Sequence, residues 1–233
     1  MKSKLRIYPG HIFSFLLILA LVIMDRSVDD WGRLSNGFGN LISFFHESLW
    51  PPDWGVLEPR VYPECTASSA LEFTCSTAWI GIVETLQIAF VSTILAMAIS
   101  LPMALMAARN VSTFRTAAVI RFILAALRSL PSLIWAIFFV ILVGFGAISG
   151  IFAMTIYSIG YLGKLQYEAI EGMNSLSLEA ADAAGLSRLE KAIHVVIPES
   201  ANDLISQAIF MFEYNVRHGS IIGIVGAGGI GYY

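Results

Sequence analysis

The sequence predicts an all-α fold, a polytopic helical bundle that spans a membrane, and three observations lead to this prediction. Hydrophobic residues make up 57% of the 233 residues and charged residues only 13%, whereas soluble domains carry roughly a quarter of charged residues. Several apolar runs approach or exceed the roughly 20 residues that a helix needs to cross a bilayer. Lys and Arg lie at alternating ends of these runs, as the positive-inside bias requires. Lipid is therefore the expected solvent.

Residues 1–24 are predicted to form an N-terminal membrane anchor helix. The apolar run Ile12–Met24 follows Lys2, Lys4 and Arg6, so the N-terminus is expected on the cytoplasmic side. The run has the length of a signal peptide, but the residues after it offer no small-residue cleavage site. We expect it to stay attached as a first, slightly short span.

Residues 25–76 are predicted to form an external loop, because acidic residues and prolines recur along this stretch. Apolar residues between Leu41 and Trp50 have near-helical spacing, which suits a short amphipathic segment at the membrane interface. A packed loop fits the same pattern equally well. Cys65 and Cys75 both fall in this loop, where a disulfide or two free thiols are both open.

Residues 77–233 are predicted to form the main transmembrane domain. Four spans are expected here, at about 79–108, 117–143, 151–170 and 204–216. Arg109 and Arg115 mark a cytoplasmic end, and the uncharged turn Gly144–Gly150 suits the external side. Pro131 is expected to kink the third span of the chain. Glu84 and Gln87 lie on the second span, where we expect them to form hydrogen bonds between helices.

The cytoplasmic loop 171–200 is predicted to form a helical hairpin. Helix formers fill the segment from Ser177 onward, and the segment stops at Gly185, the usual residue after a helix C-terminus. Ser187 and Glu190 fit a capping box that opens a second helix. That helix is expected to end before Pro198.

The hairpin resembles the loop that receives the ATPase in ABC importer permeases, whose signature has Glu-Ala-Ala, then Gly, then Ile-Pro. The matching residues are Glu179-Ala180-Ala181, Gly185 and Ile197-Pro198. The resemblance implies that the first helix docks in a cleft of a separate ATP-binding subunit. It assigns this docking to Glu179, Ala180, Ala181, Gly185, Arg188, Ile197 and Pro198. The alternative is an ordinary cytoplasmic hairpin of another transporter.

A second block, from Phe212 to Gly231, resembles the phosphonate-type branch of these permeases, which has F-E-x-N-V-R followed by G-x-V-G-A-G-G-I-G. Further matches lie at Arg128–Pro131 and Gly160–Lys164. The resemblance implies the type I, MetI-like permease fold, a homodimer, an external substrate-binding protein and a phosphonate or related oxyanion such as phosphite or a phosphate ester as cargo. Permeases of this kind continue into a final span after the glycine run, so this sequence is expected to lack that span.

Charged residues inside spans are costly, and each needs a partner or a function. The candidate pathway or gate residues are Arg128, Pro131, Glu213, Asn215, Arg217, Gly226, Gly228, Gly229 and Gly231. For an oxyanion cargo, Arg128 or Arg217 is the obvious attractant. The alternative, which we favour, pairs Arg217 with Glu213 and Lys164 with Glu168, each one helical turn apart.

Several function classes are excluded or disfavoured. The net charge of −3 and the scattered cations argue against a nucleic-acid partner. The Walker A motif is absent, so ATP hydrolysis is assigned to a partner; no cofactor or enzyme activity is expected. The G-x-G-x-x-G run from Gly226 to Gly231 lacks the context of a dinucleotide site. The expected function is an inner-membrane permease subunit. A permease for another small solute such as methionine, a stand-alone secondary transporter or channel, and a membrane-embedded enzyme are the rivals.

Overall fold

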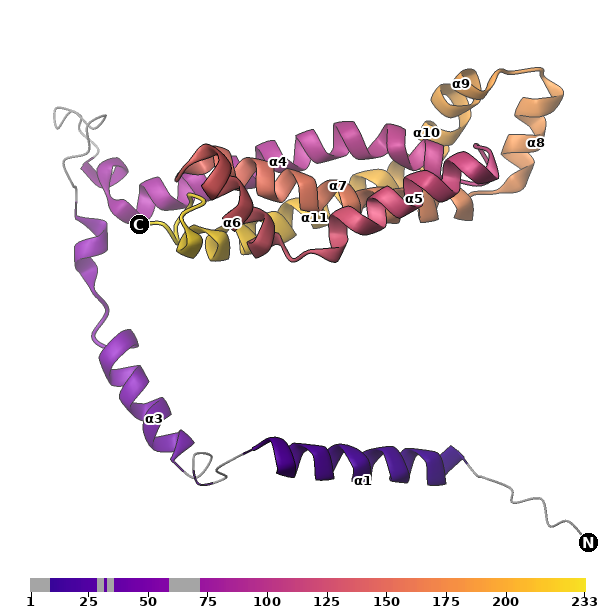
Figure 1. Cartoon of the computed structure of the whole chain (residues 1–233). Helices are drawn as coiled ribbons and strands as arrows, with labels where there is room; N and C mark the ends of the chain where they lie inside the picture. The colour runs from indigo at the N-terminus through magenta and orange to yellow at the C-terminus, as the bar shows by residue number, and fades with distance from the viewer. Residues whose placement is uncertain (1–8, 29–31, 33–35, 59–71) are drawn as a thin grey trace, which may run out of the picture. The chain divides into compact units, whose positions relative to one another are not determined.

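The computed structural model describes residues 9–28, 32, 36–58 and 72–233, and its regular elements are helices (Figure 1). The chain divides into two compact units, residues 1–54 and 55–233. Each unit is described by itself.

The first unit contains an apolar helix, α1 (Pro9–Ser27), and a shorter helix, α3 (Gly37–Phe44), which continues as a π turn (Phe45–Leu49). The large apolar side chains of both helices are exposed within the chain. Helices occupy the positions of the expected anchor and of the expected segment between Leu41 and Trp50, while membrane anchoring and an interfacial position stay predictions. The basic residues at positions 2, 4 and 6 lie outside the described residues. Within the described residues of this unit, the apolar faces of α1 and α3 are left uncovered.

The second unit is a bundle with a small helical hairpin at one end. Its helices are α4 (Thr77–Ala107), α5 (Phe114–Ser129), α6 (Ser132–Val143), α7 (Ala147–Gly172), α8 (Ser175–Ala183), α9 (Arg188–Lys191), α10 (Ile197–Glu199) and α11 (Ala201–Ile222). Before α4 lies a short 3-10 turn (Glu72–Cys75). Cys75 is disulfide-bonded, and the other cysteine of the chain, Cys65, lies outside the described residues.

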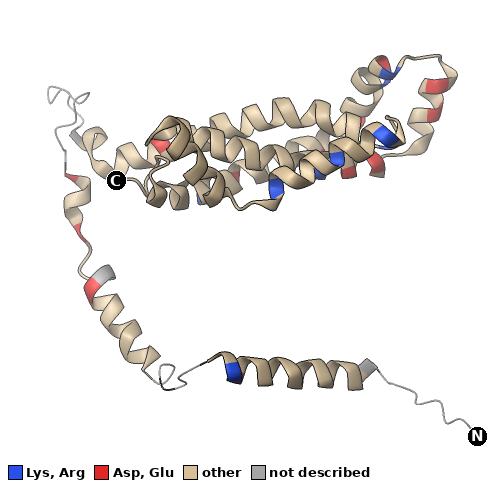
Figure 2. Cartoon of the chain, viewed as in Figure 1, with Lys and Arg blue, Asp and Glu red and all other residues tan. Residues whose placement is uncertain are grey.

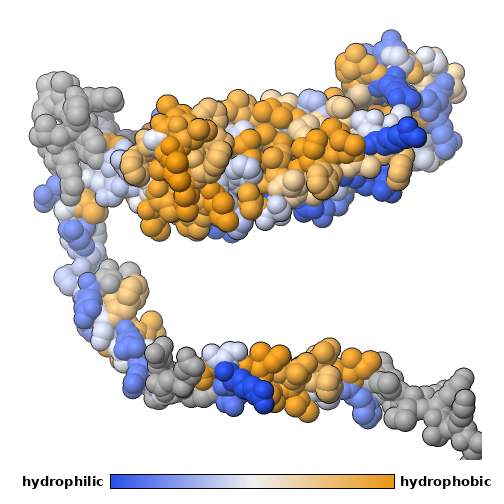
Figure 3. All heavy atoms as spheres, viewed as in Figure 1, coloured by the Kyte–Doolittle hydropathy of each residue, from blue (hydrophilic) through white to orange (hydrophobic). Residues whose placement is uncertain are grey.

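Small residues hold the centre of the bundle together. Along α4 the buried face contains mainly Gly, Ala, Ser and Thr, and α7 has a similar face. A Cβ atom on Gly160 would lie 2.8 Å from the backbone N of Arg128 and the backbone O of Leu124, so α7 and α5 touch backbone to backbone here. Lipid tails give helices no hydrophobic reason to associate, so close packing of this kind is what stabilises the bundle. The large apolar side chains point outward instead and cover its surface (Figure 3).

The expected third span is two helices, not one kinked helix. α5 ends at Ser129, α6 begins at Ser132, and the two meet at an angle of 83°. Leu130 is extended, with φ −92° and ψ 134°, as expected for a residue before proline. Pro131 lacks the N–H that a continuous helix would use and instead occupies the N-cap of α6. The sequence predicted where the bend lies and underestimated its size.

Three of the described helices are long and apolar enough to cross a membrane: Gly10–Ser27, Thr77–Ala107 and Ala147–Gly172. The bent pair α5–α6 is a fourth candidate if it counts as one span. α11, expected as a further span, is helical but does not reach the same apolarity. Its polar residues include Asp203, Gln207 and Arg217, and α11 needs neighbouring protein to shield them.

Candidate functional site

The first helix of the hairpin, α8, ends in a Schellman motif centred on Gly185. The N–H of Leu186 donates to the carbonyl of Ala181 at 3.1 Å, and the N–H of Gly185 donates to the carbonyl of Asp182 at 3.0 Å. Gly185 has φ +75°, the left-handed conformation that this motif requires and that residues with a Cβ avoid. At the other end, the side chain of Asn174 accepts from the N–H of Leu176. Both ends of α8 are therefore fixed.

The second helix, α9, begins with the predicted capping box, which is confirmed. The N–H of Glu190 donates to Ser187 Oγ at 3.4 Å, and Glu190 Oε2 accepts from the N–H of Ser187 at 2.8 Å. The hydrogen bond with the side chain of Ser187 lowers the pKa of Glu190 most, and the hydrogen bond with the backbone of Ser187 lowers it further. The carboxylate is thus stabilised in the charged form that suits a helix N-terminus.

The expectation that this helix ends before Pro198 is wrong. α9 continues as a π turn (Ala192–Val196) and then as α10, with Pro198 in the first turn of α10. In the π turn the N–H of Ile197 reaches back five residues to the carbonyl of Ala192. A proline is tolerated where a helical segment starts, because the N–H there has no helical partner in any case. The wide turn therefore carries the helix past the proline.

The hairpin is tied together and tied to the bundle. Lys191 forms an ion pair with Asp182 across the turn between α9 and α8. Val196 and Leu178 pack against a buried cluster that contains Ala104 of α4 and Ile170 of α7. Figure 2 shows charged residues gathered around this end of the unit. The hairpin therefore packs directly against the ends of two long bundle helices.

An unpredicted ion pair strengthens the same end. Arg121 of α5 pairs with Glu171 of α7, and its Nε also donates to the carbonyl of Ala107 at 2.9 Å. Its guanidinium lies 4.3 Å from the ring centroid of Tyr167, and the N–H of Arg109 donates to Glu171 at 2.7 Å. Arg121 and Glu171 are 50 positions apart, so the sequence gives no sign that they meet.

The predicted docking residues differ in exposure. Glu179, Ala180, Gly185, Arg188 and Pro198 are exposed, and Ile197 is half-buried. Ala181 is 4% exposed and packs inside the chain. A shallow apolar groove of about 330 Å³ runs beside the hairpin. Its lining residues are Pro102, Leu105, Met106, Val111, Ser112, Arg188, Leu189 and Ala192.

The two predicted intrahelical ion pairs are present. Arg217 Nη2 lies 2.5 Å from Glu213 Oε1, with both side chains 67% exposed, and Lys164 Nζ lies 3.4 Å from Glu168 Oε1. Asn215 has a different environment, because it is fully buried between Ser158 of α7 and Thr93 of α4. Its amide joins three helices, which is the geometry of a packing residue.

The glycine run after α11 folds back as a tight turn against the ends of α4 and α7. Gly226, Gly228 and Gly229 are buried with positive φ, and Gly231 is exposed. The N–H of Ile230 donates to Thr85 Oγ1 at 2.8 Å. The turn follows a helix instead of the β-strand of a dinucleotide fold. The glycines allow the backbone of the turn to pack closely against α4 and α7, while a gating role stays a prediction.

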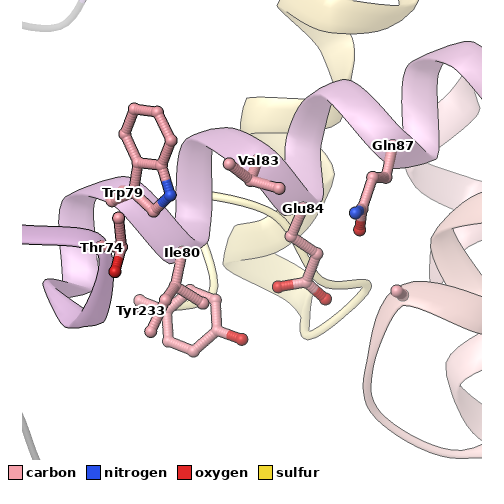
Figure 4. A pocket seen from close by; sticks show the side chains of 8 residues that line it. Thr74, Trp79, Ile80, Val83, Glu84, Gln87 and Tyr233 are labelled. Carbon is pink, nitrogen blue, oxygen red and sulfur yellow. The ribbon is translucent and has the colours of Figure 1, made fainter. Parts of the chain in front are cut away.

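Within the part of the chain that the structure describes, Glu84 and Gln87 do not form the expected hydrogen bonds between helices. Both line an open hollow beside the N-terminal part of α4, and Tyr233 lines the same hollow (Figure 4). The Oε2 atom of Glu84 is buried and has no hydrogen-bond partner among the described residues. Gly228 lies close to this carboxylate, because a Cβ atom built on Gly228 would be 2.9 Å from Glu84 Oε1. The glycine turn, and not a neighbouring helix, therefore packs beside Glu84.

Arg128 and Pro131 lie at the break between α5 and α6, on a second hollow of about 420 Å³. The hollow is lined by Arg128, Ser129, Pro131, Ser132, Leu133, Tyr157, Tyr214, His218 and Ile221. Its polar groups come from α5, α6, α7 and α11. The sequence singled out Arg128 but gave no sign of the tyrosines and the histidine beside it, because they come from distant segments.

Comparison with known proteins identifies one matching family. Residues 100–233 match the model of the binding-protein-dependent transport system inner membrane component. The chain is 41% identical over 224 residues to the putative phosphite transport system permease protein HtxC of Stutzerimonas stutzeri, an alignment that covers 95% of this chain and 73% of the relative. It is 40% identical over 163 residues to the phosphite transport system permease protein PtxC of the same organism, covering 69% of this chain and 59% of that relative. The aligned chain thus spans less than two thirds of the PtxC protein.

Among solved structures, the chain is similar to one described as the inward-facing MetNI methionine ABC transporter. The TM-score is 0.60 at 26% sequence identity, and the match covers 66% of this chain and 78% of that one. The all-α, MetI-like permease fold expected from the sequence is therefore confirmed.

Proposed function

The chain belongs to the family of binding-protein-dependent transport system inner membrane components, and from this premise we propose that it is the permease subunit of an ATP-driven importer. It is a multi-pass protein of the inner membrane. A separate ATPase binds the hairpin α8–α9 and supplies the energy, so the chain itself catalyses no reaction. The N-terminus lies in the cytoplasm, on the same side as the hairpin.

The observation that carries this proposal is the rigid attachment of the hairpin. The docking surface consists of the exposed residues Glu179, Ala180 and Arg188 next to the turn at Gly185. Behind this surface, the Lys191–Asp182 ion pair joins the two helices of the hairpin, and the cluster around Val196 packs the hairpin against the bundle. A movement of the ATPase is thereby passed to α4 and α7, and a two-state bundle biased in this way gives alternating access.

The proposed cargo is a phosphonate or a related oxyanion such as phosphite or a phosphate ester. The relatives named phosphite permeases support this class. Another small solute such as methionine is the second candidate, supported by the similarity to the methionine transporter. A stand-alone secondary transporter or channel would not need the rigid hairpin.

The proposed partners are the ATPase, an external substrate-binding protein and a second copy of this chain. The exposed Glu213–Arg217 pair supports a second permease subunit, because charged side chains are costly against lipid. A second α11 across a polar pathway would shield the pair from the acyl chains. A homodimer is the simplest arrangement that provides it.

Reconstitution tests the proposal. The full-length chain is placed in proteoliposomes with its ATPase and binding protein, and uptake of radiolabelled phosphite is measured with ATP, without ATP and without the ATPase. We expect uptake only when both ATP and the ATPase are present. Equal flux without nucleotide would instead support a secondary transporter, and competition by methionine but not by phosphonate would move the cargo to the second candidate.

A further inference from the structure

Arg128 lacks the carboxylate partner that three other basic residues of the bundle helices have in the described part of the chain. Among the described residues, Arg121, Lys164 and Arg217 each have a carboxylate partner. Arg128 has neither an ion pair nor a side-chain hydrogen bond in the described part of the chain, and it is exposed on the hollow at the α5–α6 break. An unpaired guanidinium between membrane helices is costly unless it faces water or an anion.

Tyr157 offers a second donor to the same hollow. The hydroxyl of Tyr214 lies 2.9 Å from that of Tyr157 and donates to it. The hydroxyl proton of Tyr157 is therefore free to donate elsewhere. The two rings stack at 11°, with centroids 5.6 Å apart, which fixes the direction of the pair.

His218 closes the same side of the hollow. Its Nδ1 lies 3.0 Å from the carbonyl oxygen of Tyr214, and because a carbonyl only accepts, Nδ1 carries a proton. The imidazole also stacks on the Tyr214 ring at 3.7 Å. Nε2 is then the ring atom left for a ligand. The first turn of α6, which begins at Ser132 on the rim, adds backbone N–H groups without helical partners.

We propose that this hollow is a transient binding site for the transported oxyanion, with Arg128 as the charge partner and Tyr157 as a neutral donor. The inference rests on the proposed function and names the site within that pathway. A guanidinium fork and a directed hydroxyl match the oxygens of a tetrahedral phosphorus oxyanion. The volume of about 420 Å³ also holds roughly a dozen waters at about 30 Å³ each. The ion therefore stays partly hydrated and leaves readily, as transport requires.

The test uses the complete reconstituted importer and compares Arg128→Gln with Arg115→Gln. Both residues are exposed arginines of α5 without an ion pair in the described part of the chain, and only Arg128 lines the hollow. We expect Arg128→Gln to lower phosphite uptake about 10- to 100-fold, from the loss of a charged hydrogen-bonding group, and Arg115→Gln to stay within about twofold. Arg128→Lys should fall between wild type and Arg128→Gln, because an ammonium keeps the charge and loses the fork.

Tyr157→Phe tests the proposed site independently of Arg128, because it removes the hydroxyl and keeps the ring that stacks on Tyr214. Its expected effect is a rise of about 3- to 10-fold in KM for phosphite, with ATPase binding unchanged. Equal uptake by Arg128→Gln and Arg115→Gln would overturn the site. If Arg128→Gln fails to assemble with the ATPase, an unchanged KM in Tyr157→Phe overturns it. Absence of ATP-dependent uptake by the wild-type importer would instead mean that the proposed function fails.

Discussion

Gly185 shows how much of the docking surface depends on a single residue. Its φ of +75° closes the Schellman motif of α8, and apart from its chain neighbours no atom of the described residues lies within 4 Å of a Cβ built there. The conformation therefore excludes most side chains, while the open space leaves room for a partner to approach the backbone. Its place at the end of a helix was readable from the sequence, because helix termination by glycine is a local rule.

Substitution of Gly185 tests the docking surface. Gly185→Arg should abolish co-purification of the ATPase, because it adds bulk and about 1–2 kcal/mol of backbone strain. Gly185→Asn should retain most binding, since Asn tolerates the left-handed conformation. The matched control is Gly172→Arg, which adds the same side chain at an exposed helix end without a positive φ. Equal ATPase recovery with Gly185→Arg and Gly172→Arg would argue against docking at this turn.

Among the other contacts, those between residues close in sequence were predicted correctly and those between distant residues were missed. The Ser187–Glu190 capping box and the Glu213–Arg217 pair were predicted because each joins residues within one helical turn. The Arg121–Glu171 pair could not be predicted, since it depends on how α5 and α7 pack. The buried Oε2 atom of Glu84, which has no hydrogen-bond partner in the described part of the chain, was missed for the same reason: its neighbours are set by the glycine turn.

At the scale of elements, apolar run length and composition predicted where the helices lie, but the local rules failed at the two prolines, Pro131 and Pro198. Pro131 indicated a bend, but the 83° angle depends on α6 packing back against α7. Pro198 was read as a helix stop, yet a π turn carries the helix past it. A rule based on proline alone does not include the packing of neighbouring helices, so it predicts neither the angle at Pro131 nor the π turn before Pro198.

Gly160 offers a test of the packing between α5 and α7. A Cβ there would meet backbone atoms of α5 at 2.8 Å, and backbone cannot move aside cheaply. Gly160→Ala should therefore destabilise the bundle by about 1–3 kcal/mol, seen as a lower thermal unfolding midpoint in detergent. Gly163→Ala should cost less, because its nearest neighbour is the end of the Leu124 side chain. Gly172→Ala, with nothing within 4 Å, is the control, and a midpoint for Gly160→Ala equal to that of Gly172→Ala would contradict the account.

At the scale of the molecule, the fold class and the family were predictable from the sequence. The composition indicates a membrane protein and the ordered sequence motifs indicate the family, and neither requires knowledge of how the helices pack. The hollow at Arg128 was not, since Tyr157 and His218 come from different helices. The two proposed working parts lie in different places: the hairpin lies beyond the ends of α4 and α7, and the hollow lies at the α5–α6 break. In the proposed function, the bundle between them converts movement of the ATPase into passage of a solute.

Cross-linking from α8 in membranes that hold the complete importer tests the coupling most directly. A photoreactive probe is attached to a cysteine at Ala180→Cys, on the exposed docking surface, and in a control at Ile141→Cys, which is 81% exposed on the apolar side of α6. The account predicts an adduct of permease and ATPase from position 180 and none from position 141. ATP-driven uptake without any adduct from position 180 would contradict it.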